Sequence, residues 1–178
     1  MRRIILIGYM GSGKTTMGKA LSKHMGLMFY DLDWYIESRM HRSVPQLFAE
    51  RGEEAFRQIE HNMLHEVAEF EDVIISCGGG TPCFFDNIDY LNRQGDVVYL
   101  KATPEVLYRH LLMAKVERPL LKGKSPEELI DYITEHLKER EPYYLKARHV
   151  LDVSVLDSHD KISNSVEQLC QMLEKIKK

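Results

Sequence analysis

The sequence has few cysteines, little net charge and no long apolar run. Its three cysteines, Cys77, Cys83 and Cys170, are an odd number without metal-ligand spacing, which predicts reduced thiols in a cytoplasmic protein. Charged residues make up 29% of the chain, but the net charge is only −3, so no basic footprint for nucleic acid is present. No apolar stretch approaches the roughly 20 residues that span a bilayer, and we expect no membrane segment.

The amino-terminal residues superficially resemble a signal peptide. The apolar run after Arg2 and Arg3 ends at Gly8, however, and no small-residue cleavage site follows, so a first buried strand is the better interpretation. A chain of 178 residues, 44% of them hydrophobic, is sufficient for one domain with a substantial core. We therefore expect residues 1–178 to form a single domain.

Short apolar segments alternate with longer segments of helical periodicity. The predicted strands are residues 3–8, 27–33, 73–76, 97–100 and 149–153. The predicted helices are residues 14–25, 53–69, 104–115, 126–146 and 161–177. Strands that are apolar on both faces and separated by helices predict an α/β fold, in which helices cover both faces of a parallel sheet.

Residues 8–15, G-Y-M-G-S-G-K-T, match G-x-x-x-x-G-K-[ST] at every fixed position, between a predicted strand and a predicted helix. Such a loop wraps its backbone N–H groups around phosphates at the positive end of the helix dipole. Lys14 can reach the β- and γ-phosphates, and Thr15 can offer its hydroxyl to Mg²⁺. The predicted ATP-binding residues of this loop are Gly11, Ser12, Gly13, Lys14, Thr15 and Thr16.

Other nucleotide-binding folds fit less well. Asp33 lies where a dinucleotide fold places its ribose-binding acid, but the glycine pattern that begins at Gly11 requires a small residue at Thr16. The chain has no N-K-x-D motif for guanine and is too short for the added elements of large ATPases. A small-molecule kinase is therefore the leading class.

Beyond the phosphate-binding loop, the ordered motifs are D-L-D at 31–33, F-R at 56–57, G-G-G at 78–80, R-P-L-L at 118–121 and R-E-P-Y-Y at 140–144. In their order and spacing, over nearly the whole chain, they resemble the shikimate kinase family. The resemblance implies ATP-dependent phosphorylation of the 3-hydroxyl of shikimate by a monomer. It also implies a five-stranded parallel sheet of order 2-3-1-4-5, a substrate-binding segment at about 33–61 and a lid at about 114–124.

Asp31 and Asp33 end the second predicted strand, where open α/β sheets place ligands, and strand alternation would send them to the same face. The resemblance implies that Asp31, with Thr15, lies on the Mg²⁺ side and that Asp33 orients or deprotonates the substrate hydroxyl. The third predicted strand ends in I-I-S without an acid, which supports Asp31 in that role. The alternative for Asp33 is a helix N-cap.

Arginine can grip a carboxylate with two parallel hydrogen bonds. The resemblance singles out Arg57 and Arg140 for the shikimate carboxylate. On spacing alone, Arg57 forms an ordinary intrahelical pair with Glu53, and Arg140 belongs to a solvated charge run that Pro142 could distort. Gly78, Gly79 and Gly80 permit positive φ or a close approach of ligand or backbone, and the resemblance implies substrate binding there; a flexible turn is the alternative.

On the nucleotide side, the resemblance implies that Arg118 is a lid arginine that acts on the transferred phosphoryl group, and that Arg109 packs on the adenine. A solvent-facing Arg118 is the alternative. The loop after the last predicted strand, residues 153–158, departs from the family because it has no arginine. The rival functions are a kinase for another polyol acid such as gluconate, a nucleoside monophosphate kinase, or a silent nucleotide-binding module.

Overall fold

The computed structural model describes residues 2–114 and 125–174 of the chain. Its centre is a parallel five-stranded sheet of order β2-β3-β1-β4-β5, which confirms the predicted fold class and strand order. The strands, each within two residues of a predicted one, are β1 (Arg3–Ile7), β2 (Met28–Asp31), β3 (Val73–Ser76), β4 (Asp96–Lys101) and β5 (His149–Asp152).

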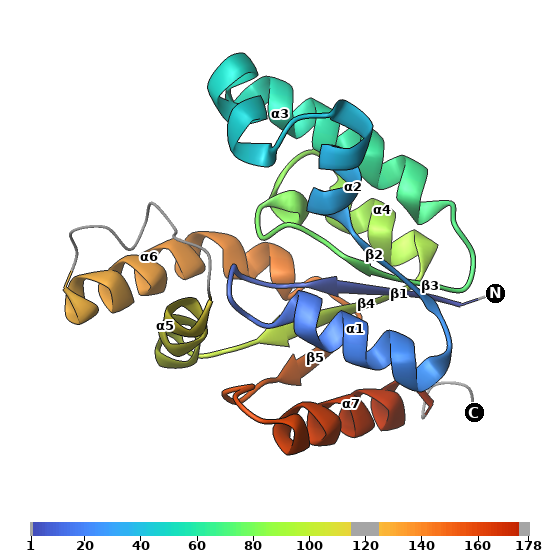
Figure 1. Cartoon of the computed structure of the whole chain (residues 1–178), viewed down its shortest axis with the longest axis vertical. Coiled ribbons are helices and arrows are strands. Elements are labelled where there is room, and N and C mark those ends of the chain that lie inside the picture. Colours follow the sequence, from blue (N-terminus) through green and yellow to red (C-terminus); the bar gives the residue numbers. More distant parts are fainter. Residues whose placement is uncertain (1, 115–124, 175–178) are drawn as a thin grey trace.

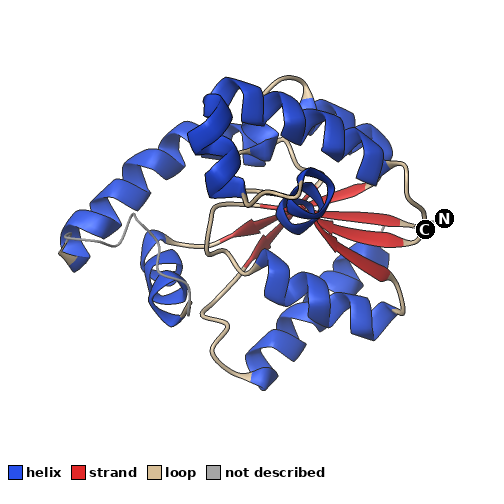
Figure 2. Ribbon diagram, turned by 45° about the horizontal axis from the view of Figure 1, so that its top comes forward, coloured by secondary structure: helices blue, strands red, loops and turns tan. Residues whose placement is uncertain are grey.

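Helices cover both faces of this sheet (Figures 1 and 2). They are α1 (Lys14–Met25), α2 (Leu32–Met40), α3 (Val44–Ala68), α4 (Asn87–Gln94), α5 (Pro104–Met113), α6 (Pro126–Tyr144) and α7 (His159–Glu174), with a short 3₁₀ turn η1 (Thr81–Cys83). Helices α1 and α7 pack together on one face, and α3 and α4 lie on the other. This arrangement follows from right-handed crossovers, because the chain moves in opposite directions after β1 and after β3.

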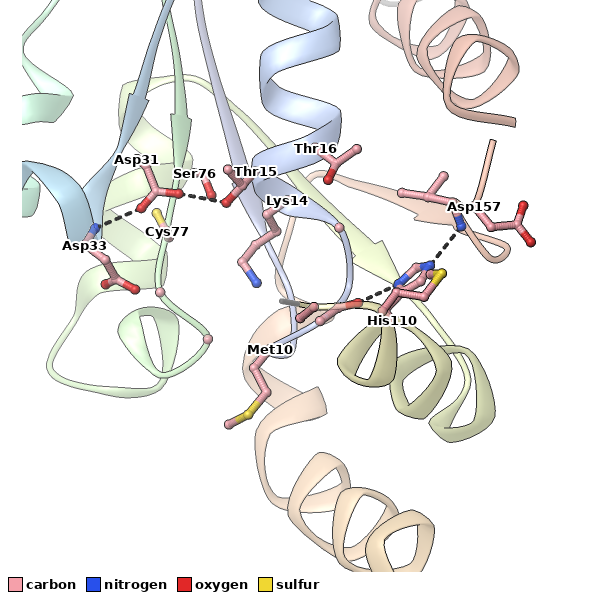
Figure 3. Close-up of a pocket in the computed structure, with 17 residues that line it drawn as sticks. Met10, Lys14, Thr15, Thr16, Asp31, Asp33, Ser76, Cys77, His110 and Asp157 are labelled. Atoms are coloured by element: carbon pink, nitrogen blue, oxygen red, sulfur yellow. Dashed lines mark hydrogen bonds between the residues drawn. The ribbon is translucent and has the colours of Figure 1, made fainter. Parts of the chain in front are cut away.

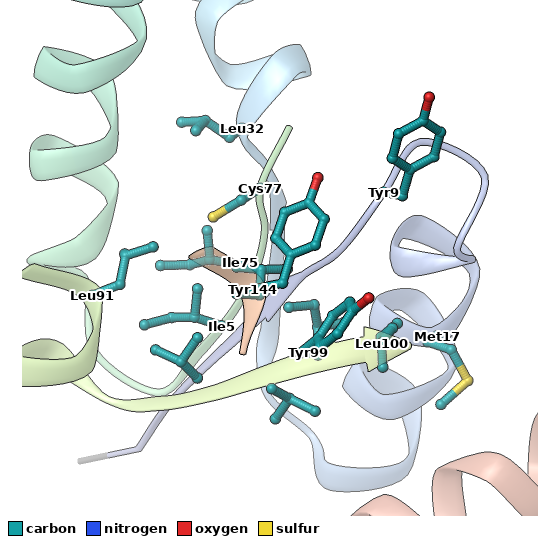
Figure 4. Packing of buried hydrophobic residues seen from close by; sticks show 14 of the residues in the cluster. Ile5, Tyr9, Met17, Leu32, Ile75, Cys77, Leu91, Tyr99, Leu100 and Tyr144 are labelled. Carbon is teal, nitrogen blue, oxygen red and sulfur yellow. The ribbon is translucent and has the colours of Figure 1, made fainter. Parts of the chain in front are cut away.

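The central strand β1 explains why the sheet needs two helical layers. Ile4, Ile5, Leu6 and Ile7 have no exposed surface, so side chains on both faces of the strand are buried. Around Ile5, the core also contains Ile75 of β3 and Leu91 of α4 (Figure 4). Burial of such side chains contributes about 1.5–3 kcal/mol each, which holds the carboxyl ends of the strands, and the loops that follow them, in fixed positions.

The prediction was wrong where the second strand meets α2. The predicted strand, 27–33, ends at Asp31 because the Asp31 carboxylate accepts a hydrogen bond from the Asp33 N–H and thereby caps α2. Helix α2 itself was not predicted, since L-D-W-Y-I-E-S-R-M carries no clear apolar stripe. Asp31 and Asp33 are thus not alternate residues of one strand, and the N-cap is Asp31 rather than Asp33.

Helix α3 is longer than predicted. It begins at Val44 with a capping box between Ser43 and Gln46, and Gly52 interrupts it with non-helical backbone at φ 78°. The predicted helix that begins at residue 53 corresponds to the part after this kink. Helix α4 and the η1 turn were missed as well, because both are too short to show a periodic pattern.

Other helices end within two residues of their predicted ends, as far as the described residues reach. The predicted lid, about 114–124, lies outside the described residues except for Ala114. Within the ranges 2–114 and 125–174, no helix combines the length and apolar character needed to cross a membrane.

Candidate active site

A cavity of about 480 Å³ opens at the carboxyl ends of the strands (Figure 3). Its walls come from the P-loop, the ends of β2 and β3, the end of α5 and the loop after β5. The lining residues are Met10, Gly11, Gly13, Lys14, Thr15, Thr16, Asp31, Asp33, Ser76, Cys77, Gly78, Gly79, His110, Met113, Ala114, Leu156 and Asp157. Most of the predicted phosphate and metal residues therefore share one cavity with three of the predicted acceptor residues, Asp33, Gly78 and Gly79.

The P-loop connects β1 to α1. Gly13, at the N-cap of α1, has φ 91°, and a Cβ there would lie 2.5 Å from Leu156 Cδ1, so only glycine fits. Lys14 is 9% exposed, and its Nζ donates to the carbonyl oxygens of Gly8 and Tyr9 at 2.9 Å each. The ammonium group is thereby positioned over the loop, pointing into the cavity (Figure 3).

The hydroxyl of Thr15 donates to Asp31 Oδ2 at 2.8 Å, and Asp31 Oδ1 accepts from the Asp33 N–H at 3.2 Å. A hydroxyl and a carboxylate form the hard oxygen set that Mg²⁺ prefers, completed by water and phosphate oxygens. Thr15 keeps its lone pairs free of this bond because its proton is the donor. The two predicted metal-side residues thus fit Mg²⁺.

The carboxyl group of Asp33 lies in the cavity near Lys14 (Figure 3). The pKa of Asp33 is raised from 3.8 to about 6, mainly by burial and also by the nearby carboxylates of Asp31 and Glu60, while Lys14 partly opposes the rise. A carboxylate with this pKa is ionised at neutral pH but remains basic enough to accept a proton.

Arg57, on α3, is 8% exposed and lies behind the glycine segment rather than in the cavity wall. Its Nη1 bonds Glu60 Oε2 at 2.8 Å, and its Nη2 reaches Glu53 Oε1 at 3.3 Å. The intrahelical pair with Glu53 therefore exists, but Glu53 is exposed and Glu60 is buried. Arg57 Nε is buried and has no hydrogen-bond partner in the described part of the chain.

Residues 78–80 permit close approach rather than unusual backbone angles. A Cβ on Gly80 would lie 2.5 Å from Arg57 Nη2, whereas φ at Gly80 is −87°. None of these three glycines has positive φ, so it is close approach, and not backbone conformation, that requires glycine here. Arg140 Nη1 lies 3.5 Å from the position of a Cβ on Gly79, which brings both predicted arginines to this segment.

Arg140 is half-buried, and its Cζ lies 5.9 Å from the centre of the Tyr9 ring. Helix α6 continues through Pro142 and ends at Tyr144. The Tyr144 hydroxyl donates to the Gly79 carbonyl oxygen at 2.5 Å, and Tyr9 donates to or accepts from His136 Nδ1 at 2.9 Å. The last turns of α6 thus hold both Arg140 and the glycine segment.

His110, which was not predicted, joins the two halves of the nucleotide side. Its Nδ1 bonds the Gly11 carbonyl oxygen at 2.6 Å, and its Nε2 accepts from the Leu156 N–H at 2.8 Å (Figure 3). Because carbonyl oxygens only accept, the proton is on Nδ1. His110 therefore ties the P-loop to the loop after β5 with a defined tautomer.

The other residues predicted for the nucleotide side, Arg109 and Arg118, are not among the described residues that line the cavity. Arg109 is exposed on α5 and does not line the cavity. The pKa of Asp157 is lowered, mainly by a hydrogen bond from Lys161 and to a small extent by the charge of Arg109. Arg118 lies outside the described residues. In the loop after β5, which has no arginine, Leu156 and Asp157 line the cavity.

Three residues that position the site were missed: Glu60, His110 and Tyr144. Glu60 binds both Arg57 and the Thr81 hydroxyl, the latter at 2.6 Å. His110 and Tyr144 bond residues more than 40 positions away, and Glu60 bonds Thr81 21 positions away, so helical periodicity could not indicate these contacts. For Glu60, the position three residues after Arg57 was the one available signal.

The parallel sheet, the P-loop and the acids at the end of β2 define a P-loop phosphotransferase for a small molecule. Comparison with known families narrows this class, because the family model described as shikimate kinase matches residues 10–174. The chain belongs to the shikimate kinase family, whose reaction moves the γ-phosphoryl group of ATP to shikimate.

Individual relatives agree. The chain is 57% identical to a shikimate kinase of Phocaeicola vulgatus over 98% of this chain and 100% of that protein. The crystal structure of shikimate kinase from Bacteroides thetaiotaomicron matches with a TM-score of 0.94 at 51% identity, over 97% of this chain and 98% of that one.

A second solved structure, shikimate kinase from Acinetobacter baumannii in complex with shikimate, matches with a TM-score of 0.82 at 30% identity, over 98% of this chain and 94% of that one. Together these similarities decide against the gluconate kinase, the nucleoside monophosphate kinase and the silent module as the function of this chain.

Proposed function

We propose that the cavity at the carboxyl edge of the sheet holds ATP and shikimate in line, with Lys14 beside the γ-phosphoryl group and Asp33 beside the acceptor hydroxyl. The observation that carries this assignment is the shared cavity. The Asp33 carboxyl, the Lys14 ammonium and the Thr15 hydroxyl all line it, and Arg57 and Arg140 reach the glycine segment that forms its far wall.

On the nucleotide side, the P-loop N–H groups of residues 11–16 bind the phosphates at the amino-terminal end of α1, where the helix dipole favours anions. Lys14 exchanges its two carbonyl partners for phosphate oxygens. The adenosine lies toward His110 and Leu156, with Arg109 near enough to stack on the base once its exposed side chain turns inward.

The Thr15 hydroxyl and the Asp31 carboxylate would hold Mg²⁺. When bound, the ion neutralises charge on the phosphate oxygens and orients the γ-phosphoryl group. The support is the existing hydrogen bond between the two side chains, which already places their oxygens together.

On the acceptor side, the shikimate carboxylate binds the guanidinium groups of Arg57 and Arg140. Arg57 Nε is a buried donor without a partner among the described residues, and such a group is costly unless a ligand satisfies it. Glu60 holds the same guanidinium from the other side, so Arg57 is preorganised for a planar anion. Because Gly78–Gly80 have no side chains, the two guanidinium groups can approach this segment closely.

Asp33 accepts the proton of the attacking hydroxyl or fixes its direction. Its raised pKa supports the proton-accepting role, because a base with a pKa near 6 balances ionisation against basicity at neutral pH. Arg118, outside the described residues, then acts on the transferred phosphoryl group from the segment at about 114–124.

We further propose that the enzyme acts as a monomer of one domain over residues 1–178, with a substrate-binding segment at about 33–61. Reduced thiols at Cys77, Cys83 and Cys170 support a cytoplasmic location.

The substrate assignment is tested by measuring the binding of shikimate and the binding of ATP independently. Arg57→Ala should weaken shikimate binding about 10- to 100-fold, because a charge-assisted hydrogen bond contributes about 1.5–3 kcal/mol, and should change ATP binding by less than about twofold. Calorimetric titration with each ligand measures both.

Two variants serve as controls. Arg57→Lys keeps a cation beside buried Glu60, so it separates loss of the guanidinium fork from loss of folding. Arg51→Ala removes an exposed arginine of the same helix and should change neither affinity. Equal weakening of ATP and shikimate in Arg57→Lys would place Arg57 outside the acceptor site.

A further inference from the structure

A second cluster of potential ligands lies away from the ATP cavity, between α3 and the start of α4. One ring nitrogen each of His61 and His65 and a carboxylate oxygen of Asp86 lie within 4.8 Å of one another. The two histidines stand four residues apart on α3, a spacing that puts both rings on one face and that recurs in helical zinc sites.

His61 is prepared to act as a ligand. Asn87 Nδ2 donates to the Thr81 carbonyl oxygen at 2.9 Å, so Asn87 turns its Oδ1 toward His61 Nδ1, 2.6 Å away. The His61 proton must therefore be on Nδ1, which leaves the lone pair on Nε2. A hydrogen bond of this kind from the second ring nitrogen fixes tautomer and ring orientation in metal-binding histidines.

The His65 ring is fixed by stacking, and one of its ring nitrogens lacks a hydrogen-bond partner among the described residues. Its ring stacks on Tyr90, with centroids 3.7 Å apart and planes 14° from parallel. Its Nε2 is buried and has no hydrogen-bond partner within the described residues. A buried polar atom without a partner is unusual in a folded protein and indicates a group that binds something absent here.

Two imidazoles and one carboxylate suit a divalent transition ion of the zinc type better than Mg²⁺ or Ca²⁺, which take oxygen ligands. Tetrahedral Zn²⁺ at about 2.0–2.1 Å from each ligand requires ligand atoms roughly 3.3 Å apart. The cluster must therefore close by at most about 1.5 Å, and Asp86, which is exposed, can move toward the two imidazoles by a rotamer change.

We propose that His61, His65 and Asp86 form a binding site for a zinc-type divalent cation, separate from the Mg²⁺ site at Thr15 and Asp31. The ion would link α3 to the start of α4. Glu60, which precedes His61 on α3, holds Arg57, so one helix carries both a ligand of this site and the support of the proposed shikimate-binding arginine.

The test uses Zn²⁺ itself on the metal-free full chain, without nucleotide and with millimolar Mg²⁺ present to fill oxygen sites. Titration calorimetry should find one saturable Zn²⁺ per chain. His61→Gln and His65→Gln should each weaken it by at least about tenfold, since even outer-shell changes cost about 10- to 100-fold. Co²⁺ should show the intense visible absorption of a tetrahedral site.

Asp86→Asn keeps the fold at an exposed position and should weaken binding as well. The matched control is His24→Gln, an exposed histidine at the end of α1, which should bind Zn²⁺ like the parent chain. Absence of saturable Zn²⁺ binding in the parent chain, or unchanged affinity in folded His65→Gln and Asp86→Asn, would overturn the proposal.

Discussion

Replacing Asp33 by asparagine should make the unliganded protein more stable and nearly inactive. The carboxyl group is buried beside Asp31 and Glu60, and this environment raises its pKa from 3.8 to about 6. The folded protein therefore binds the Asp33 proton more tightly than the unfolded chain does. At neutral pH the ionised carboxylate costs folding free energy, and a neutral amide of the same shape avoids that cost.

The size and pH dependence of this cost follow from the two pKa values. Below about pH 4 both states are protonated and the cost vanishes; it grows as the pH rises through about 6 and is complete above that. A difference of about two pKa units corresponds to about 3 kcal/mol at pH 8 and to roughly half of that at pH 5.

Urea unfolding of the metal-free and nucleotide-free protein at pH 8 and pH 5 measures this difference. Asp33→Asn should be more stable than the parent chain at both pH values, with the larger gain at pH 8. Asp131→Asn, at an exposed position on α6, is the matched control and should shift stability by less than about 0.5 kcal/mol.

The same variant should lose about 10²- to 10⁴-fold in kcat, the usual contribution of a general base. In the parent enzyme, kcat/KM for shikimate should fall tenfold per pH unit below about pH 6, where Asp33 of the free enzyme takes up its proton. If Asp33→Asn were less stable than the parent at pH 8, or equally stabilised at both pH values, the raised pKa would be refuted.

Two further predictions concern the nucleotide side. Lys14→Ala should lower kcat/KM for ATP at least about 100-fold, because the cation that offsets phosphate charge is removed, while circular dichroism shows an intact fold; near-normal turnover would contradict the phosphate role. His110→Ala removes two hydrogen bonds that join Gly11 to Leu156, so KM for ATP should rise about tenfold with KM for shikimate unchanged; an equal rise in both would show a general structural role.

Much of the fold was predictable because its signals are local. Strands buried on both faces, such as β1, require continuous apolar segments, and the G-x-x-x-x-G-K-T loop between strand and helix requires its glycines at fixed positions. These constraints act within ten residues or so, and they therefore appear directly in the sequence. The cap of α2 at Asp31 was not predicted, because residues 31–33 continue the apolar alternation of the strand and also begin the helix.

By itself the sequence determined the α/β class, the phosphate-binding loop and, through ordered motifs, the family. Only the tertiary structure decided how the site is supported: Glu60 accepts a hydrogen bond from Thr81, 21 positions away, and Tyr144 fixes Gly79. His110 joins Gly11, 99 positions before it, to Leu156, 46 positions after it. The reason is physical. A periodic pattern records which side of an element is buried, but a buried hydrogen bond depends on which elements meet, and that is set only when the sheet and its helices pack together.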